Sequence, residues 1–262
     1  MIDLKMTGKV ALVSGATGGI GRELCKMLKR EGCKIGFIAR NQEKADALIR
    51  ELDMGDDLYC YIGQIYNEED VKAFTEGAYA HFGKLDMLFP NAGYEGKWEY
   101  VNNFTKENFD KVFGTNVLGV MYMIKYGADY LVAQGKGSIV ITSSDGALLG
   151  SAGMGVYCAS KHAVQAIVKT AAAELGPKGV NVNSVNPGGV DTAMIRNIED
   201  NALGDSVSRE EKSAQFTAGY FDKRYATAEE CANMLLFLAS DWASHMFGER
   251  VSIDGGECVL RP

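Results

Sequence analysis

Tyr157 and Lys161 stand at a spacing that lets them act together in proton transfer. Because they are four residues apart, their side chains lie on one face of any helix that contains them. A free tyrosine has a pKa of about 10 and is a poor base at neutral pH, but a nearby ammonium group favours the phenolate. Lowering that pKa by about three units requires about 4 kcal/mol of differential stabilisation. The same spacing occurs by chance on many helices, so its meaning depends on the residues around it.

Ser144 and Asn116 are the polar residues best placed to support such a pair. Ser144 lies thirteen residues before Tyr157, just after an apolar run that predicts a strand, and its hydroxyl could hold a carbonyl oxygen. Ser143 competes for that role, and serine is also common where strands end. Asn116 lies inside a long helical stretch although asparagine is a poor helix former. It therefore either satisfies a local backbone group or holds a water in a proton relay.

A glycine-rich turn occupies residues 14–21, with the sequence Ser-Gly-Ala-Thr-Gly-Gly-Ile-Gly. It follows a predicted strand at 10–13 and opens a predicted helix at 19–29. Glycines allow the tight turn and let the backbone approach a pyrophosphate, while the helix amino terminus supplies free N–H groups and a positive dipole. A glycine turn alone is weak, but this position in a βαβ unit indicates a dinucleotide site.

The end of the second predicted strand, at 35–38, bears on the choice of cofactor. A site selective for NAD usually places an acid here to hold the ribose 2′-OH, and Ala39 cannot do so. Arg40 can instead pair with a 2′-phosphate, which predicts NADP(H) as the preferred cofactor with NAD(H) as the other possibility. The alternative is that Arg40 is a solvated residue at the start of a helix.

Short apolar runs alternate with longer helical stretches along the whole chain. This pattern predicts a Rossmann-like, doubly wound α/β fold with about seven parallel strands and helices on both faces. We expect a single dinucleotide-binding and catalytic domain over 1–262, with a polar substrate flap around 194–225. A capping box at Thr227 begins the last long helix. Further strands are expected at 58–62, 87–89, 138–141, 180–185 and 251–253, and helices at 43–52, 68–82, 106–133, 156–175 and 227–239.

Composition excludes several classes of protein. The 262 residues carry a net charge of −7 without a Lys/Arg-rich run, so nucleic acid is not expected as a partner. No apolar run is long enough for a membrane span, and the amino terminus lacks a signal pattern, so we expect a cytoplasmic protein. The six cysteines form no C-x-x-C pair and are expected to be reduced. His81, His162 and His245 show no metal-ligand spacing, so no metal is expected.

Taken together, these motifs resemble the short-chain dehydrogenase/reductase family, in its compact single-domain branch, over essentially the whole chain. The family's catalytic Asn, Ser, Tyr and Lys match Asn116, Ser144, Tyr157 and Lys161. Each motif alone is weak, but their joint occurrence in order is highly specific. The other matches are the glycines Gly15, Gly19 and Gly21, the Asn-Ala-Gly element at 91–93, the Pro-Gly-x-Val-x-Thr element at 187–192 and the Asp-Gly-Gly element at 254–256.

The resemblance implies a role for each matched residue. Tyr157 would be the general acid in reduction and the general base in oxidation, and Ser144 would orient and polarise the carbonyl. Lys161 would lower the tyrosine pKa and bond the nicotinamide ribose, while Asn116 would support a relay through water. Gln64 stands where the family often has an acid that contacts adenine. The cofactor-binding residues would be Ser14, Gly15, Thr17, Gly19, Ile20, Gly21, Arg40, Asn41, Gln64, Asn91, Ala92, Gly93, Tyr157, Lys161, Pro187, Gly188, Val190 and Thr192.

The leading hypothesis is therefore an NADP(H)-dependent oxidoreductase for a secondary alcohol or ketone. Apolar residues of the flap, Met194, Ile195 and Phe216, favour a hydroxysteroid or another bulky hydrophobic substrate. The family resemblance also implies a homo-oligomer, either a tetramer or a dimer. One alternative is a nucleotide-sugar epimerase or dehydratase, which the compact length and the glycine spacing disfavour. Another is a non-enzymatic dinucleotide-sensing module, which the presence of all four catalytic residues disfavours.

Overall fold

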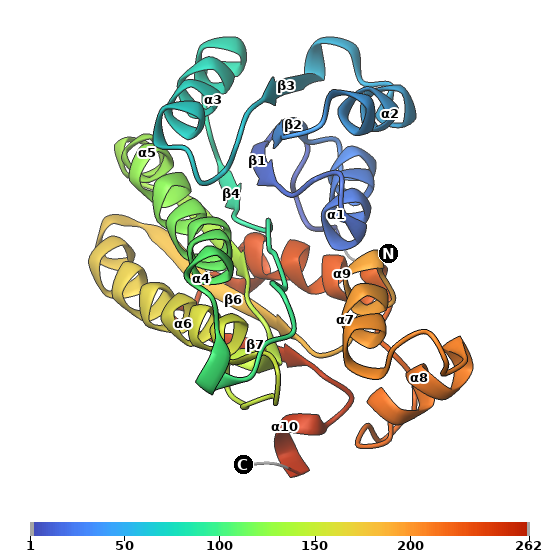
Figure 1. Cartoon of the computed structure of the whole chain (residues 1–262). Coiled ribbons are helices and arrows are strands. Elements are labelled where there is room, and N and C mark those ends of the chain that lie inside the picture. Colours follow the sequence, from blue (N-terminus) through green and yellow to red (C-terminus); the bar gives the residue numbers. More distant parts are fainter. Residues whose placement is uncertain (1–2, 261–262) are drawn as a thin grey trace.

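The computed structural model describes residues 3–260, whose strands form one seven-stranded sheet with every neighbouring pair parallel (Figure 1). The strand order is β3-β2-β1-β4-β5-β6-β7. The predicted α/β fold is confirmed, and each strand lies within two residues of its predicted bounds. The strands are β1 (Val10–Ser14), β2 (Lys34–Ala39), β3 (Leu58–Ile62), β4 (Met87–Phe89), β5 (Gly137–Thr142), β6 (Val180–Pro187) and β7 (Arg250–Ile253).

Helices cover both faces of the sheet because alternate strand residues point to opposite sides. In β1, Ala11 and Val13 join the core beneath α1, α2 and α9, whereas Val10 and Leu12 join the core beneath α3, α5 and α6. Figure 1 shows these two groups of helices on opposite sides of the strands. The helices are α1 (Gly19–Arg30), α2 (Gln42–Leu52), α3 (Glu68–Phe82), α4 (Lys106–Phe113), α5 (Gly119–Ala133), α6 (Gly155–Leu175), α7 (Ala193–Leu203), α8 (Arg209–Phe216), α9 (Ala228–Ala239) and α10 (Glu257–Leu260).

Side-chain caps fix where several of these helices begin. Asn41, Asn67 and Thr105 each accept a hydrogen bond from the backbone N–H three residues on, which starts α2, α3 and α4. Thr227 and Glu230 form the predicted capping box at the start of α9. Local sequence therefore sets the helix boundaries around the sheet, and these boundaries in turn set where each loop leaves it.

The predicted helix at 106–133 is not uniform. A π-helical turn at Gly114–Leu118 separates α4 from α5. Such turns insert one residue into the helical ladder and occur often at functional sites. Asn116 lies in this turn and is fully buried. The poor helix propensity of asparagine therefore coincides with a real irregularity, which the apolar periodicity of the segment had hidden.

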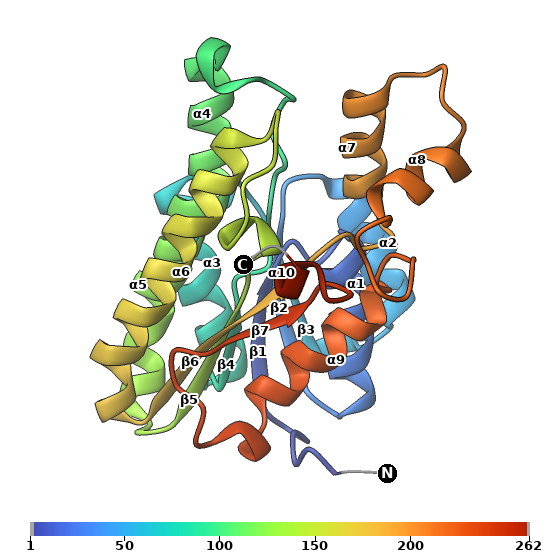
Figure 2. The same cartoon turned by 90° about the horizontal axis from the view of Figure 1, so that it is seen from below.

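The strand order reverses between β1 and β4, and this leaves a crevice beyond the carboxyl ends of the strands. The loops after β1, β4, β5 and β6 all open at this edge. Helices α7 and α8 project past the same end of the sheet, opposite the amino-terminal end of α4 (Figure 2). Residues 194–225, expected to form a flap, thus begin and end beside the crevice.

We predict that Gly21→Ala destabilises the fold, whereas Gly18→Ala does not. A Cβ on Gly21 would lie 2.2 Å from the Gly15 carbonyl oxygen and 2.7 Å from Asn91 Nδ2, inside the turn that joins β1 to α1. The expected loss is about 1–3 kcal/mol in the free energy of unfolding, measured by urea denaturation. Gly18 is the matched control, because its Cβ would meet nothing closer than 3.4 Å and its φ is −89°. Equal losses in the two variants would contradict this account of the turn.

Candidate active site

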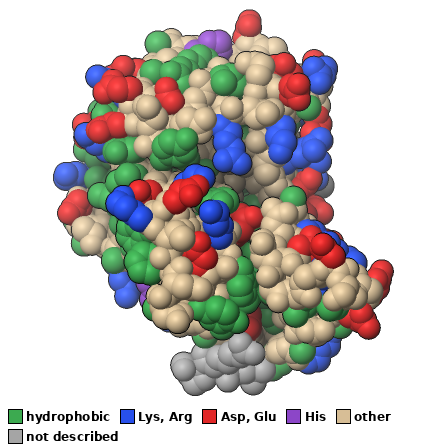
Figure 3. Space-filling model, in the orientation of Figure 1, with side chains coloured by type: hydrophobic (Ala, Val, Ile, Leu, Met, Phe, Trp, Pro, Cys, Tyr) green, Lys and Arg blue, Asp and Glu red, His purple; other side chains and the backbone are tan. Residues whose placement is uncertain are grey.

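A cavity of about 580 Å³ occupies the crevice at the carboxyl edge of the sheet. Its wall includes the glycine turn after β1 at one end and Tyr157, on α6, at the other. Figure 3 shows that the surface is hollowed on this side, above the lobe that α7 and α8 form. All but two of the predicted site residues line this cavity; Ser14 and Asn116 lie behind the wall.

The glycine turn is held by its neighbours as well as by its own hydrogen bond from Gly18 N to the Gly15 carbonyl at 3.1 Å. The Ser14 hydroxyl accepts hydrogen bonds from the backbone N–H groups of Asn91 and Ala92, each at 3.0 Å. The Asn91 amide donates to the carbonyls of Ser14 and Gly15 at 3.2 and 3.3 Å. Gly15 needs to be glycine, because its φ is +68° and a Cβ there would lie 2.8 Å from Ala92 Cα. Ser14 thus supports the turn from behind the cavity wall.

The turn leads into the amino terminus of α1, which has no acidic residue in its first turn. Backbone N–H groups at a helix start favour an anion such as a pyrophosphate. The loop after β6 approaches this turn closely, since a Cβ on Gly19 would lie 2.3 Å from Thr192 Cγ2. The elements 14–21 and 187–192, which are far apart in sequence, therefore face the same stretch of the cavity.

Two cations line the cavity where β2 ends. Arg40 and Lys44 are both exposed on the wall, and neither forms an ion pair with another residue of the described chain. The side chain of Asn41 is used as the cap of α2, accepting from Lys44 N at 2.9 Å. Gln64 also lines the cavity, and its backbone N–H donates to Asp70 at 2.8 Å. Lys44 was not predicted as a site residue from the sequence. Its position one helical turn after Arg40 was the signal that could have identified it.

Lys161 is buried beneath Tyr157, with only 3% of its surface exposed. Its ammonium donates to the Thr142 carbonyl at 3.1 Å and lies 5.6 Å from the centre of the tyrosine ring, over the ring face. Burial lowers the pKa of Lys161 to about 8. The two side chains share a helix face, as their spacing predicts.

The effect of this arrangement on Tyr157 differs from the expectation that Lys161 lowers its pKa. Burial raises the pKa of the Tyr157 phenol above its ordinary value, and the hydrogen bond with Ser144 opposes this rise only in part. The reason is that desolvation penalises the phenolate. In the chain alone, Tyr157 is therefore a protonated phenol at neutral pH.

Ser144 follows β5 and contacts both Tyr157 and the next residue along the chain. Its Oγ donates to Asp145 Oδ1 at 2.8 Å and accepts from Gly146 N at 3.1 Å. Ser143 also lines the cavity, and its buried hydroxyl has no hydrogen-bond partner among residues 3–260. Of the two serines, Ser144 is the one that hydrogen-bonds the tyrosine.

Asn116 satisfies backbone groups, which was one of the two roles considered for it. Its Oδ1 accepts from Tyr94 N at 2.8 Å, and its Nδ2 donates to the Tyr94 carbonyl at 3.1 Å. Nδ2 also donates to Ser160 Oγ at 2.9 Å, and Ser160 in turn donates to the Tyr157 carbonyl at 2.6 Å. The π-helical turn thus ties the loop after β4 to the first turn of α6.

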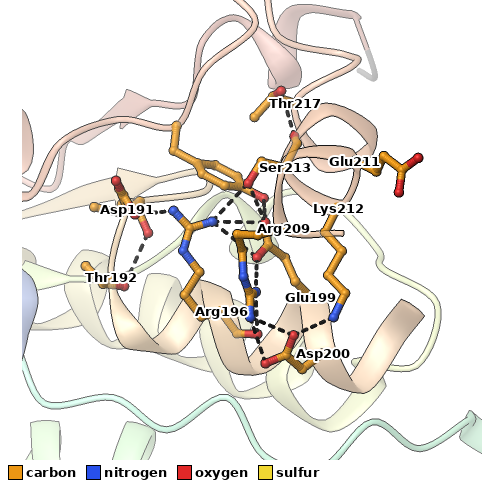
Figure 4. A network of polar contacts seen from close by, with 12 residues as sticks. Asp191, Thr192, Arg196, Glu199, Asp200, Arg209, Glu211, Lys212, Ser213 and Thr217 are labelled. Atoms are coloured by element: carbon orange, nitrogen blue, oxygen red, sulfur yellow. Dashed lines mark hydrogen bonds and ion pairs between the residues drawn. The ribbon is translucent and has the colours of Figure 1, made fainter. Parts of the chain in front are cut away.

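A buried carboxylate holds the helices of the flap together. Glu199, on α7, is fully buried and accepts from Arg209 at 2.6 Å, from Ser213 at 3.0 Å and from Tyr225 at 2.6 Å (Figure 4). Burial opposes ionisation of Glu199, but these hydrogen bonds and those from Arg196 outweigh it and hold its pKa below the ordinary value.

The same network joins the flap to the loop after β6, because Arg196 also pairs with Asp191. Met194, Ile195 and Phe216, the apolar residues expected in the flap, line the cavity on this side. The flap network itself had no signature in the sequence, since its members are spread over more than thirty residues.

Within residues 3–260, no cluster of His, Cys, Asp or Glu is arranged to hold a metal ion. None of the helices in this part of the chain has the length and apolar character needed to cross a membrane.

Comparison with known proteins gives matches along nearly the whole chain. A family model described as enoyl-(acyl carrier protein) reductase matches residues 15–257. Levodione reductase from Leifsonia aquatica is 30% identical over 97% of this chain and 95% of its own length. Secoisolariciresinol dehydrogenase from Forsythia intermedia is 31% identical over 97% of this chain and 91% of its own length.

Solved structures agree with the sequence matches. A crystal structure of levodione reductase superimposes with a TM-score of 0.92 at 30% identity and covers 97% of this chain and 99% of that one. The 3-ketoacyl-(acyl-carrier-protein) reductase from Brucella melitensis, complexed with NADH, has a TM-score of 0.87 at 28% identity and covers 96% of this chain and 99% of that one.

Burial of Lys161 predicts a pH dependence of stability. Its pKa of about 8 in the folded chain lies below the unfolded value of about 10.4. Between these values the unfolded chain binds more protons, so the wild type gains stability relative to Lys161→Met as the pH rises from about 8 to about 10. We expect a gain of about 1–3 kcal/mol, measured by urea denaturation without cofactor. Lys169→Met, at an exposed position of the same helix, should differ from wild type by a constant amount. Parallel stability curves for wild type and Lys161→Met would refute the prediction.

Proposed function

The chain belongs to the short-chain dehydrogenase/reductase family, whose members act on CH–OH and C=O groups, and on that premise we propose that it transfers a hydride between NADP(H) and a secondary alcohol or ketone. The observation that carries the proposal is a single cavity. It has a dinucleotide-type turn at one end and Tyr157, Ser144 and Lys161 at the other. A phosphate-bearing cofactor can therefore reach the groups that would handle the proton of the reaction.

The residues fit a nicotinamide dinucleotide. The acid-free start of α1 and the glycines at 15, 19 and 21 suit the pyrophosphate, and the loop at 187–192 lies beside them. We assign cofactor contacts to the cavity-lining residues predicted above, with Ser14 as their support. Asn91 fixes the shape of the cavity wall, because its side-chain amide is hydrogen-bonded to the glycine turn. When bound, the nicotinamide ring supplies or accepts the hydride.

The chain's own residues handle the proton and the substrate oxygen. Tyr157 is kept protonated by burial, so its phenol can donate a proton to the carbonyl oxygen during reduction. Ser144 orients that oxygen by a hydrogen bond from its hydroxyl, whose single proton turns from Asp145 Oδ1 to the substrate oxygen. Lys161 stabilises the phenolate that is left, since its ammonium lies over the tyrosine ring. Asn116 positions the start of α6, and a relay through water remains part of the proposal.

The preference for NADP(H) rests on charge. Arg40 and Lys44 line the cavity where β2 ends, and no acidic side chain of the described residues lies on that part of the wall. Two cations without ion-pair partners suit a 2′-phosphate, whereas an acid would be needed to favour the ribose 2′-OH of NAD.

We also propose a bulky, largely apolar substrate of the hydroxysteroid kind. Met194, Ile195 and Phe216 from the flap support it, because they present apolar side chains to the cavity beyond the catalytic groups. Apolar linings with a few placed polar groups are typical of small-molecule sites.

A homo-oligomer, either a dimer or a tetramer, is proposed as well. Phe109, Leu118 and Met121, on α4, the π turn and α5, are exposed, as are Phe237 and Trp242 near the end of α9. Exposed apolar side chains of this size suit burial against another copy of the chain. The six cysteines are free thiols, which suits the reducing cytoplasm proposed as the location.

Replacement of Tyr157 by phenylalanine tests the chemistry. Tyr157→Phe should lower kcat for ketone reduction by about 10²–10⁴-fold, because it removes the proton donor, and should change the cofactor Kd far less, because the other cofactor contacts remain. The measurement is steady-state kinetics over a panel of ketones, with fluorescence titration of NADPH. Tyr94→Phe, at another tyrosine of the cavity wall, is the control and should retain most activity. Ketone reduction by Tyr157→Phe near the wild-type rate would exclude this mechanism.

Replacement of Arg40 by aspartate tests the cofactor. Arg40→Asp should lower the ratio of kcat/KM with NADPH to kcat/KM with NADH by at least about tenfold. The substitution removes the cation that pairs with the 2′-phosphate and introduces a carboxylate that accepts a hydrogen bond from the ribose 2′-OH of NADH. Arg50→Ala, at an exposed position of α2 outside the cavity, should leave the ratio unchanged. A wild-type enzyme that prefers NADH, or that uses both cofactors equally, would overturn the assignment.

A further inference from the structure

The cavity carries opposite charges at its two ends. Arg40 and Lys44 mark the end beside β2, whereas Asp145 and Glu257 are the acidic side chains that line its wall within the described residues. Lys161, the other cation on the wall, has its ammonium turned towards the Thr142 carbonyl. The acidic end therefore faces whatever lies beside Ser144, and no cofactor contact proposed above uses it.

Asp145 is fixed next to the proposed catalytic serine. It follows Ser144 in the short helical turn Asp145–Ala147, and its Oδ1 accepts from Ser144 Oγ at 2.8 Å and from Gly146 N at 2.6 Å. This turn is pressed against the tyrosine, because a Cβ on Gly146 would lie 3.3 Å from Tyr157 Cε1. Any substrate whose oxygen meets Ser144 thus has the Asp145 carboxyl beside it.

Glu257 reaches the same place from the end of the chain. It begins α10, and its carboxyl hydrogen-bonds Asp145 and Tyr220 while also lining the cavity. Two carboxyl groups in hydrogen-bond contact cannot both ionise readily and share one proton. Burial, and secondarily the charge of Glu257, raises the pKa of Asp145 to about 7. The pair is therefore an acceptor-rich unit in which one shared proton is favoured over two negative charges.

The hydroxyl of Ser143 is a third polar group on this wall. Ser143 Oγ is buried, lines the cavity, and forms no hydrogen bond within residues 3–260. Buried hydroxyls are seldom left unsatisfied, so such a group on a cavity wall indicates a ligand or water. Ser143 and Asp145 flank Ser144 along the chain, one on each side.

We propose that Asp145 and Glu257 are specificity residues that bind a hydrogen-bond donor of the substrate, a hydroxyl or an ammonium one or two carbons from the reacting carbon. The inference rests on the proposed function and adds the substrate class: α-hydroxy ketones with vicinal diols, or amino ketones with amino alcohols. A desolvated carboxyl pair gains from such a donor. It repels a carboxylate at the same position, since two like charges out of water are strongly disfavoured.

The test compares matched substrates in matched variants. The substrates are cyclohexanone, its α-hydroxy and α-dimethylamino derivatives, and a ketocyclohexanecarboxylate, each with NADPH. The variants are Glu257→Gln and Asp145→Asn. Glu95→Gln is the control, because Glu95 acts on Tyr157 through its charge but lies outside the cavity wall. The readout is the ratio of kcat/KM for each derivative to that for cyclohexanone.

In the wild type we expect the α-hydroxy or the α-dimethylamino ketone to be preferred by about tenfold to a hundredfold, and the carboxylate to be disfavoured. Both preferences should collapse towards unity in Glu257→Gln and in Asp145→Asn and should persist in Glu95→Gln. The two derivatives separate a neutral donor from a cation. Ratios near unity in the wild type, or ratios that Glu257→Gln leaves intact, would overturn the proposal.

A binding measurement separates this failure from a failure of the proposed function. Pinacol and tert-butanol are tertiary alcohols that cannot be oxidised to ketones, so their binding to the enzyme with NADP⁺ needs no turnover. In the wild type we expect pinacol to raise the thermal unfolding midpoint more than tert-butanol does. In Glu257→Gln we expect the two alcohols to raise it by the same amount. Equal effects in the wild type, together with no preference for the α-dimethylamino ketone, would overturn the acidic-pair proposal. Loss of ketone reduction by every form of the enzyme, with the pinacol preference intact, would instead count against the proposed reaction alone.

Discussion

One residue, Thr142, fixes the distance between the two ends of the site. It is the last residue of β5, and its hydroxyl donates to Asn91 Oδ1 at 2.9 Å, which steadies the glycine turn. Its carbonyl accepts the Lys161 ammonium at 3.1 Å, and its N–H donates to the Pro90 carbonyl at 3.1 Å. The cofactor end and the proton-transfer end are therefore held by the same backbone segment, and neither can shift without the other.

The polar groups around this point are expensive to leave unpaired, which explains their dense bonding. Asn116 and Asn186 are both fully buried and use their amides on backbone carbonyls, of Tyr94 and Ser144 respectively. A buried polar group without a partner costs about 1–3 kcal/mol, so satisfied amides stabilise one arrangement of loops. Rigidity at the sheet edge is thus a consequence of burying these side chains, and it places Ser144 and Tyr157 reproducibly.

The features of this chain that depend on local pattern can be predicted from its sequence. Strands, helix caps, the glycine turn and the pairing of Tyr157 with Lys161 follow from periodicity and spacing, and the structure agrees with them. The features that could not be predicted from the sequence depend on burial in the folded structure. The raised pKa of Tyr157 arises from desolvation, and the meeting of Asp145 with Glu257 joins residues more than a hundred positions apart. No spacing rule connects such groups, although Asp145 directly follows a predicted catalytic residue.

The buried charge of Glu199 has a consequence for how such enzymes diversify. Its hydrogen bonds stay almost wholly within the segment 191–225, which also has its own small apolar cluster of Ile195, Tyr220 and Tyr225. The segment leaves and rejoins the body at neighbouring points, where Asp191 and Ala226 are hydrogen-bonded. It therefore resembles an exchangeable cassette. A change of sequence inside it would alter the apolar wall of the cavity, whereas Ser144, Tyr157 and Lys161 all lie outside the segment.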